Sequence, residues 1–261
     1  MSAATSDALD PLQQFRLDGQ VALVTGASSG LGERFARVLY AVGATVVVTA
    51  RRAERLDALV ADLPGAIAIA ADVGDPADRE WLIAETLDRA GRLDVLVNNA
   101  GVSFTVNIES ETLDQFERAM AINATAVWHL SKLVVPHMTE RGSGSIVNVA
   151  SMLGHVGSAP IKQANYCASK GAVVNLTREL ALQLARRGVR VNALCPGYFP
   201  SEMTEPMIDD EGSQHYIRTY SGIPRMGAEH ELDGALLLLA GPAGSYITGT
   251  SLLVDGGFTA R

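Results

Sequence analysis

The chain of 261 residues lacks the features of several common protein classes. Its two cysteines, Cys167 and Cys195, are too few for a disulfide framework or a cysteine zinc site. We expect both to be small, reduced core thiols, which favours a cytoplasmic location. No apolar run reaches the ~20 residues that span a bilayer, and the polar segment from Met1 to Leu17 has no apolar stretch of the secretory type. The sequence therefore predicts no membrane association.

Positive charge is not in excess either. Lys and Arg number 21 against 29 Asp and Glu, so the formal net charge is −8. Nucleic-acid binding requires clustered positive charge, and we expect no nucleic-acid partner. His129, His137, His215 and His230 show no metal-ligand spacing with one another, so no metal site is expected. Apolar residues make up 48 % of the chain, which excludes disorder along its whole length.

Short apolar runs alternate with helical patterns from residue 21 onward. Strands are expected at residues 21–24, 45–49, 66–71, 95–98, 145–149, 190–195 and 251–254. Helices are expected at residues 31–42, 53–63, 76–90, 112–135, 165–187 and 229–239. Continuously apolar strands that alternate with helices form a parallel sheet covered on both faces. The sequence thus predicts a three-layer α/β fold with a doubly wound parallel sheet.

The chain shows no repeat, linker or low-complexity tract. Residues 19–261 are therefore expected to form one domain, after a flexible N-terminal extension at residues 1–18. Residues 198–220 interrupt the alternation and contain Pro200, Met203, Pro206 and Met207. A long irregular segment of this kind is typical of a mobile lid over a site.

A glycine-rich turn joins the first expected strand to the first helix. Gly26, Gly30 and Gly32 have the spacing G-x-x-x-G-x-G, which differs from the common G-x-G-x-x-G fingerprint. The physical requirements are similar: a tight turn, a backbone that approaches a pyrophosphate, and a helix N-terminus with unpaired N–H groups. Many α/β turns use glycine, but the strand–turn–helix context favours a dinucleotide cofactor here.

The end of the second expected strand has no acidic residue at position 49 or 50. Folds that prefer NAD place a carboxylate there to accept hydrogen bonds from the ribose. Arg51 and Arg52 follow instead, and a guanidinium suits the 2′-phosphate of NADP(H). We expect NADP(H) to be preferred, with NAD(H) as the alternative; two solvated arginines at a helix start are the other interpretation.

Tyr166 and Lys170 are four residues apart, so on a helix they lie on the same face. A carbonyl oxygen that gains a hydride needs a proton, which a tyrosine hydroxyl can supply. The ordinary pKa of tyrosine is ~10, and a nearby cation lowers it by favouring the phenolate. The pair therefore predicts an acid/base centre, although Y-x-x-x-K alone is a frequent pattern.

Two more polar residues are candidates for this chemistry. Ser151 follows the expected strand at 145–149, and α/β sheets bind ligands at the carboxyl ends of their strands. Asn123 stands inside an expected helix, although asparagine is a poor helix former. A functional Ser151 would hydrogen-bond a substrate oxygen, and a functional Asn123 would interrupt the helix and hold a water behind Lys170; structural roles are the alternative for both.

Taken in order, these motifs resemble the short-chain dehydrogenase/reductase family, in its single-domain branch. The resemblance covers residues 21–257. It comprises the turn from Thr25 to Gly32, Asp72-Val73, Asn98 to Gly101, the set Asn123, Ser151, Tyr166 and Lys170, then Pro196-Gly197, Thr248-Gly249 and Asp255 to Gly257. Each motif is short, and the ordered set is specific. The resemblance implies a Rossmann-like fold and hydride transfer between NADP(H) and a small-molecule carbonyl or secondary alcohol.

The resemblance also implies a role for each site residue. Tyr166 would be the acid/base, and Lys170 would lower its pKa and hold the nicotinamide ribose. Ser151 would orient the substrate oxygen, and Asn123 would anchor a proton-relay water. The implied cofactor-binding residues are Gly26, Ser28, Ser29, Gly30, Leu31, Gly32, Arg51, Arg52, Asp72, Val73, Asn99, Ala100, Gly101, Tyr166, Lys170, Pro196, Gly197, Phe199 and Ser201.

The substrate pocket is expected to be lined by Phe104, residues 152–155, Gln163 and the segment 198–220. Most of these side chains are apolar or aromatic, which suits a medium-sized ketone. His155 lies close enough in sequence to Ser151 to touch substrate, but a local hydrogen bond is the preferred interpretation.

Two other functions stay open. A related branch reduces β-keto chains on acyl carrier protein and grips that acidic carrier with arginines on two helices. His129 and Leu182 occupy those positions here, which disfavours a 3-oxoacyl-(acyl carrier protein) reductase. A non-catalytic dinucleotide-binding protein is the second alternative. Members of the resembled branch are commonly tetramers or dimers, so a homotetramer or homodimer through the helices at 112–135 and 165–187 is expected.

Overall fold

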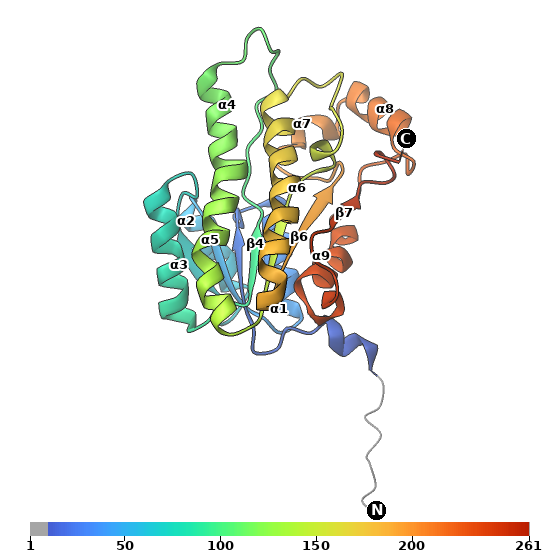
Figure 1. Ribbon diagram of the computed structural model, residues 1–261. Helices are drawn as coiled ribbons and strands as arrows, with labels where there is room; N and C mark the ends of the chain where they lie inside the picture. Colours follow the sequence, from blue (N-terminus) through green and yellow to red (C-terminus); the bar gives the residue numbers. More distant parts are fainter. Residues whose placement is uncertain (1–9, 261) are drawn as a thin grey trace, which may run out of the picture.

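Residues 10–260 are described by the computed structural model, and they form a parallel sheet between two layers of helices (Figure 1). The strands are β1 (Val21–Thr25), β2 (Thr45–Ala50), β3 (Ile67–Ala70), β4 (Val95–Asn98), β5 (Gly144–Val149), β6 (Val189–Pro196) and β7 (Ser251–Val254). They lie in the order β3-β2-β1-β4-β5-β6-β7, and every neighbouring pair is parallel. The predicted doubly wound α/β fold is confirmed.

Helices cover both faces of this sheet (Figure 1). One face carries α1 (Gly30–Ala41), α2 (Ala53–Ala61) and α9 (Asp233–Ala240). The other carries α3 (Pro76–Ala90), α5 (Ala126–Glu140) and α6 (Ala164–Leu184). Successive strand residues point to opposite faces, so Ala22 and Val24 of β1 join the first core while Val21 and Leu23 join the second. Burial on both faces explains why the strands are continuously apolar.

The order of the strands places a ligand crevice at one end of the sheet. The chain leaves β1 for β2 on one side and later returns to β4 on the other side of β1. Connections that leave in opposite directions separate at the carboxyl ends of these two strands, and open α/β sheets bind ligands there. The site is therefore expected above β1 and β4.

Residues 1–18 were expected to form a flexible extension, but residues 10–18, the part that the structure describes, are folded. Residues Pro11–Phe15 form the short helix η1, which Asp10 caps through its side chain. Leu17 is fully buried in the first core, and its N–H donates to the Val42 carbonyl at 2.9 Å. Residues 10–18 thus pack on the folded domain, and Leu17 is their buried side chain. Residues 1–9 lie outside the described part of the chain.

The single helix expected at residues 112–135 is divided. It consists of α4 (Leu113–Met120), a π-helical turn η2 (Ala121–Thr125) and α5, which continues past Pro136. Asn123 lies in the π turn, so the expected interruption of the helix at this asparagine is present. The remaining short helices are η3 (Met152–Gly154), η4 (Ala185–Arg187), η5 (Glu229–Leu232) and η6 (Pro242–Gly244).

The irregular segment expected at residues 198–220 contains two helices. α7 (Glu205–Ile208) is short, and α8 (Glu211–Tyr220) begins at Asp210, whose side chain accepts the Ser213 N–H. Tyr216 and Ile217 bury one side of α8. None of the helices between residues 10 and 260 is long and apolar enough to cross a membrane.

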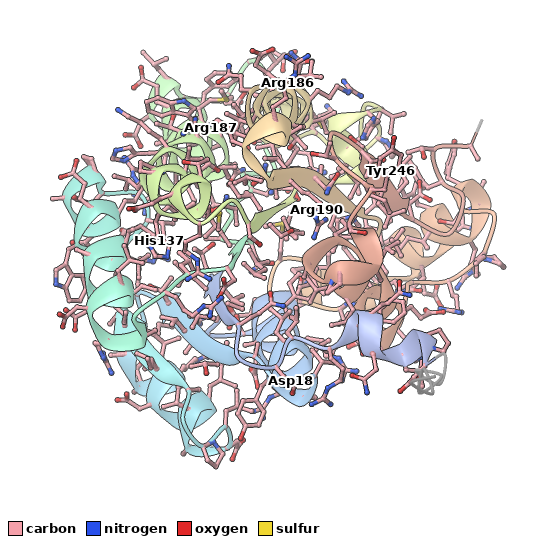
Figure 2. The ribbon with its side chains drawn as sticks, turned by 60° about the horizontal axis from the view of Figure 1, so that its bottom comes forward. Asp18, His137, Arg186, Arg187, Arg190 and Tyr246 are labelled. Carbon is pink, nitrogen blue, oxygen red and sulfur yellow. The ribbon has the colours of Figure 1, made fainter. Side chains whose placement is uncertain are left out.

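Charged side chains also bind the backbone at the end of the sheet where the strands begin, and Figure 2 labels Arg190 among them. Arg190 donates to the carbonyls of Leu239, Ala240 and Gly241 at 2.8, 3.2 and 3.1 Å, and so caps the end of α9. Nearby, the Asp94 side chain is only 6 % exposed. It accepts the Val21 N–H at 2.9 Å and is held by Arg92 at 2.7 Å and Arg141 at 3.0 Å. Asp94 therefore fastens the starts of β1 and β4 together.

We predict that Asp94→Ala lowers the free energy of unfolding by about 2–3 kcal/mol, because it leaves a buried N–H and two arginines without their acceptor. Urea denaturation measures this. Asp18→Ala is the control, because the Arg16–Asp18 pair is exposed and its loss should cost less than ~1 kcal/mol. Equal losses in the two variants would contradict a structural role for the Asp94 cluster.

Candidate active site

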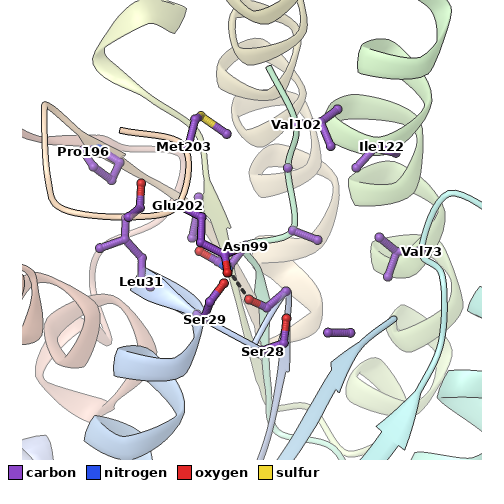
Figure 3. Close-up of a pocket in the computed structure, with 18 of the residues that line it drawn as sticks. Ser28, Ser29, Leu31, Val73, Asn99, Val102, Ile122, Pro196, Glu202 and Met203 are labelled. Atoms are coloured by element: carbon purple, nitrogen blue, oxygen red, sulfur yellow. Dashed lines mark hydrogen bonds between the residues drawn. The ribbon is translucent and has the colours of Figure 1, made fainter. Parts of the chain in front are cut away.

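A cavity of about 390 Å³ opens at the carboxyl ends of β1 and β4 (Figure 3). Its lining contains every residue that the sequence assigned to a cofactor, together with the predicted catalytic residues Ser151, Tyr166 and Lys170. Glu202, Met203 and Thr204, from the segment expected to line the pocket, are in the lining as well, and the residues not expected there are Ala50, Ala71, Val102, Ile122, Val149 and Ala150. Residues more than 150 positions apart in the chain therefore meet in one hollow.

The floor of the cavity is a backbone cradle that fits a phosphate. Gly26 has a φ of +68°, and a Cβ on Gly32 would lie 2.2 Å from the Gly26 carbonyl oxygen. Ser29 precedes α1 without a side-chain hydrogen bond to the helix, whereas Asp75 and Thr112 cap α3 and α4. The first N–H groups of α1 are thus left facing the hollow, which is the arrangement that binds an anion.

Two polar side chains join the ends of β1 and β4 beneath this cradle. The Thr25 hydroxyl accepts the N–H groups of Asn99 and Ala100, both at 3.0 Å. In return the Asn99 amide donates to the Thr25 carbonyl at 2.9 Å. Thr25 does not line the cavity, and it is a positioning residue. It was expected only as the start of the glycine-turn motif, without a role of its own, and its place as the last residue of β1 was the available signal.

Tyr166 and Lys170 lie one turn apart on α6 and face the same cavity, as predicted. The Lys170 ammonium lies 5.6 Å from the centre of the Tyr166 ring and donates to the Val149 carbonyl at 2.7 Å. Lys170 is only 3 % exposed, and this burial lowers its pKa to about 8. An ammonium held here is therefore costly to the fold.

The expected lowering of the Tyr166 pKa by Lys170 is not found in this structure. Burial raises the pKa of Tyr166 to about 12, and the hydrogen bond with Ser151 offsets part of that rise. Loss of water around the phenol is the largest cause of this rise, and the hydrogen bond of the Lys170 ammonium goes to a backbone carbonyl. Tyr166 is therefore a protonated phenol at neutral pH.

Ser151 and Asn123 flank this pair from opposite sides. Ser151 follows β5, lines the cavity, and accepts the Leu153 N–H at 3.1 Å. Asn123 is fully buried outside the lining and binds both the N–H and the carbonyl of Val102 at 2.8 Å. A Cβ on Gly101 would lie 3.3 Å from the Asn123 side-chain oxygen and 3.6 Å from the Lys170 nitrogen. Asn123 thus orders the backbone beside Lys170.

The two arginines after β2 differ in their surroundings. Arg51 is exposed, lines the cavity, and has no hydrogen bond or ion pair to any residue of the described range 10–260. Arg52 donates to Ser28 and Ser29 at 2.9 and 3.0 Å and forms a two-pronged pair with Glu202. The sequence does not distinguish the two arginines, whereas within residues 10–260 Arg51 is unpaired and Arg52 is engaged.

The segments expected around a substrate are held by side-chain amides. Asn165 clamps Phe104 through the Phe104 N–H at 3.2 Å and the Phe104 carbonyl at 2.8 Å. Gln163 pairs with Ser103 at 2.8 Å. His155 does not line the cavity, and the local hydrogen bond expected of its ring is replaced by a contact with Cys195 of β6, whose sulfur lies 3.6 Å from the Nε2 atom. Met152 and Leu153, expected in the pocket wall, are buried in the protein.

A second hollow, of about 680 Å³, lies at the opposite end of the sheet. Its lining includes Asp94, Arg190 and Tyr246. Asp94 and Arg190 are already engaged by the arginines and carbonyls described above. The first cavity, and not this hollow, contains the unpaired Arg51, the phenol and the anion cradle.

Comparison with known proteins connects this arrangement to a family. Residues 20–212 match the family described as short chain dehydrogenase. The chain is 41 % identical to galactitol 2-dehydrogenase (L-tagatose-forming) of Cereibacter sphaeroides, over 94 % of this chain and 97 % of that one. It is 39 % identical to a 3-oxoacyl-[acyl-carrier-protein] reductase of Synechocystis, over 92 % and 97 %. Gluconate 5-dehydrogenase of Burkholderia cenocepacia, solved with NADP and tartrate, superposes with a TM-score of 0.91 at 34 % identity, over 97 % and 100 %.

We predict that Lys170→Met stabilises the protein by roughly 1–3 kcal/mol at pH 7, because it removes a buried ammonium. The lysine destabilises fully below its folded pKa of about 8, and this penalty fades as the pH approaches its ordinary value of 10.5. The gain should therefore shrink between pH 8 and 10.5, as followed by thermal unfolding across pH. Lys162→Met, at an exposed lysine, is the control and should show no such gain; a pH-independent difference would disprove the burial argument.

Proposed function

The chain belongs to the short-chain dehydrogenase family, and on that premise we propose that it transfers a hydride between NADP(H) and a small-molecule ketone or secondary alcohol. The observation that carries this proposal is that Ser151, Tyr166 and Lys170 open into the same cavity as the anion cradle of α1. The glycine approach and the uncapped helix N-terminus fit a dinucleotide pyrophosphate. When bound, this cofactor supplies the hydride.

The side chains of this site then handle the proton. In the reduction, the Tyr166 hydroxyl donates its proton to the carbonyl oxygen of the substrate, and the Ser151 hydroxyl hydrogen-bonds the same oxygen. A phenol with a raised pKa is in the protonated form that this step requires. The nearby Lys170 ammonium favours the phenolate that remains after proton transfer, and Asn123 keeps the backbone beside Lys170 in place.

The choice of NADP(H) over NAD(H) rests on Arg51. Its guanidinium lines the cavity without a partner in the described part of the chain, and a 2′-phosphate would provide one. Solved relatives support this choice, since several were crystallised with NADP. NAD(H) remains the alternative cofactor.

The substrate we propose is a free small molecule. The names of similar proteins include dehydrogenases of galactitol, gluconate and meso-2,3-butanediol, which are small alcohols or sugar acids. A 3-oxoacyl-(acyl carrier protein) reductase is the second candidate, because a relative at 39 % identity has that activity in its name. The surface disfavours this second candidate, because an acidic carrier is gripped by positive charge at these positions. Burial and Arg79 lower the pKa of His129, whose ring accepts a hydrogen bond from Arg79, and this favours the uncharged ring. Leu182, at the other carrier-gripping position, carries no charge.

We also propose that the chain acts as a homotetramer or homodimer. α5 and α6 expose Trp128 and Leu182, the latter 79 % accessible, which fits the expected contact through these helices. The cytoplasmic location expected from the cysteine content is retained as a proposal, and Cys167 and Cys195 are both free thiols.

We predict that Tyr166→Phe lowers kcat for ketone reduction by ~10²–10⁴-fold, because the substrate oxygen loses its proton donor. Reduction of a panel of small ketones, followed through NADPH absorbance, measures this, and NADPH binding should change little. Tyr40→Phe is the control, because among residues 10–260 its hydroxyl bonds the Pro64 carbonyl and neither residue lines the cavity. An unchanged rate would remove Tyr166 from the mechanism, and NADPH binding without turnover of any carbonyl by the wild type would favour the non-catalytic alternative.

We predict that Arg51→Asp reduces the preference for NADPH over NADH by roughly 10–100-fold, because a charge-assisted hydrogen bond is replaced by repulsion. The measurement is the ratio of kcat/KM for the two cofactors with one ketone. Arg186→Asp makes the same charge change at an exposed position near the end of α6, and its ratio should equal that of the wild type. An unchanged ratio in Arg51→Asp would show that this arginine does not recognise the 2′-phosphate.

A further inference from the structure

A carboxylate from a distant part of the chain lies on one of the two arginines at the cofactor cavity. Glu202, next to Ser201 in the segment after β6, places both oxygens on Arg52 at 2.9 Å. The two residues are 150 positions apart. A second guanidinium, that of Arg55, contacts the same carboxylate at 2.5 Å. Glu202 lines the cavity (Figure 3), and its carboxylate therefore joins the segment after β6 to the start of α2.

This contact is more than a chance surface pair. The hydroxyls of Ser28 and Ser29 bind the same Arg52 guanidinium, at 2.9 and 3.0 Å. Hydrogen bonds from Arg52, and then from Arg55 and Ser29, lower the pKa of Glu202 to about 2 although its burial opposes this. Two guanidinium groups and two hydroxyls gathered at a cavity make an anion site, and in this structure its anion is the Glu202 carboxylate.

We propose that Glu202 is a cofactor-specificity residue, whose carboxylate occupies the anion site at Arg52 in the cofactor-free protein and competes there with the 2′-phosphate of NADP(H). This inference rests on the proposed function. NAD(H) carries no 2′-phosphate and leaves the Arg52–Glu202 pair intact. NADP(H) brings a group with a charge of about −2 next to a carboxylate, so either Glu202 leaves or two anions share the arginines.

The position of Glu202 indicates which of the two cofactors it favours. NAD-binding folds carry an acid at the end of the second strand, and positions 49 and 50 of this chain lack one. Glu202 returns a negative charge to the same neighbourhood from another segment. It therefore opposes the preference that Arg51 creates, and the net selectivity is the difference between the two effects.

The test compares the purified full chain with Glu202→Gln in calorimetric titrations with two fragments, adenosine 2′,5′-bisphosphate and adenosine 5′-diphosphate. Only the first carries a 2′-phosphate. We expect Glu202→Gln to bind the bisphosphate roughly tenfold more tightly, which corresponds to about 1.4 kcal/mol. Its affinity for the diphosphate should stay within about twofold of the wild type, because the pyrophosphate cradle is unchanged.

Glu205→Gln is the matched control. It removes the same charge three residues further along the same segment, at an exposed side chain without a hydrogen bond or ion pair to the described residues. Its affinities for both fragments should equal those of the wild type, and a thermal unfolding scan of each variant confirms that the fold is intact.

Two results would overturn the proposal. Weaker binding of the bisphosphate by Glu202→Gln would mean that Glu202 orients Arg52 for the phosphate instead of competing with it. Equal affinities in wild type, Glu202→Gln and Glu205→Gln would mean that the pair has no influence on this site. Failure of the proposed function looks different, because the wild type would then turn over no small ketone or secondary alcohol with either NADPH or NADH, whatever it binds.

Discussion

The close approach of three backbone segments at the carboxyl ends of β1 and β4 is the constraint on which the site depends. A Cβ on Gly26 would lie 2.8 Å from the Cα of Ala100, and one on Gly32 would lie even closer to the Gly26 carbonyl oxygen. Asn99 can return its amide to the Thr25 carbonyl only because these segments touch. The contact turns the start of α1 toward the hollow and holds the loop after β4 against it. Every other part of the cavity is arranged around this floor.

The reactive residues lower the stability of the fold, and the surrounding structure compensates for that loss. Lys170 is buried against the end of β5 with a lowered pKa, and Tyr166 is held as a phenol by the same dry surroundings. An ammonium and a phenol in such a place do not contribute to stability as apolar side chains would. The fully engaged amide of Asn123, in its π-helical turn, shows how the surrounding structure keeps the backbone next to Lys170 ordered. Stability and chemistry make opposite demands at these positions.

Much of the fold follows from local sequence patterns, and the departures have local physical causes. β4, β7 and α3 have the expected bounds, because their apolar runs end at clear turn residues and α3 begins with a capping aspartate and a proline. The helix expected at 112–135 is divided because the Asn123 side chain binds the backbone of Val102, a partner that helical periodicity does not reveal. α8 was hidden among prolines and polar residues, and burial of Tyr216 beside Tyr198 stabilises it. Of the site, spacing predicted the shared face of Tyr166 and Lys170, but the direction of the Tyr166 pKa shift depends on burial that a sequence does not show.

The electrostatics of the cavity mouth show why cofactor choice in such a fold is not decided at the end of β2 alone. Residue types at positions 49 to 52 describe one wall, and they favour a 2′-phosphate. The segment after β6 forms the facing wall and brings Glu202 onto Arg52, so that one of the two expected phosphate ligands is already neutralised. An arginine contributes to anion binding only to the extent that no carboxylate within the protein engages it first. Selectivity therefore depends on the balance between Arg51, which is unpaired in the described chain, and an internal pair that the incoming phosphate must break.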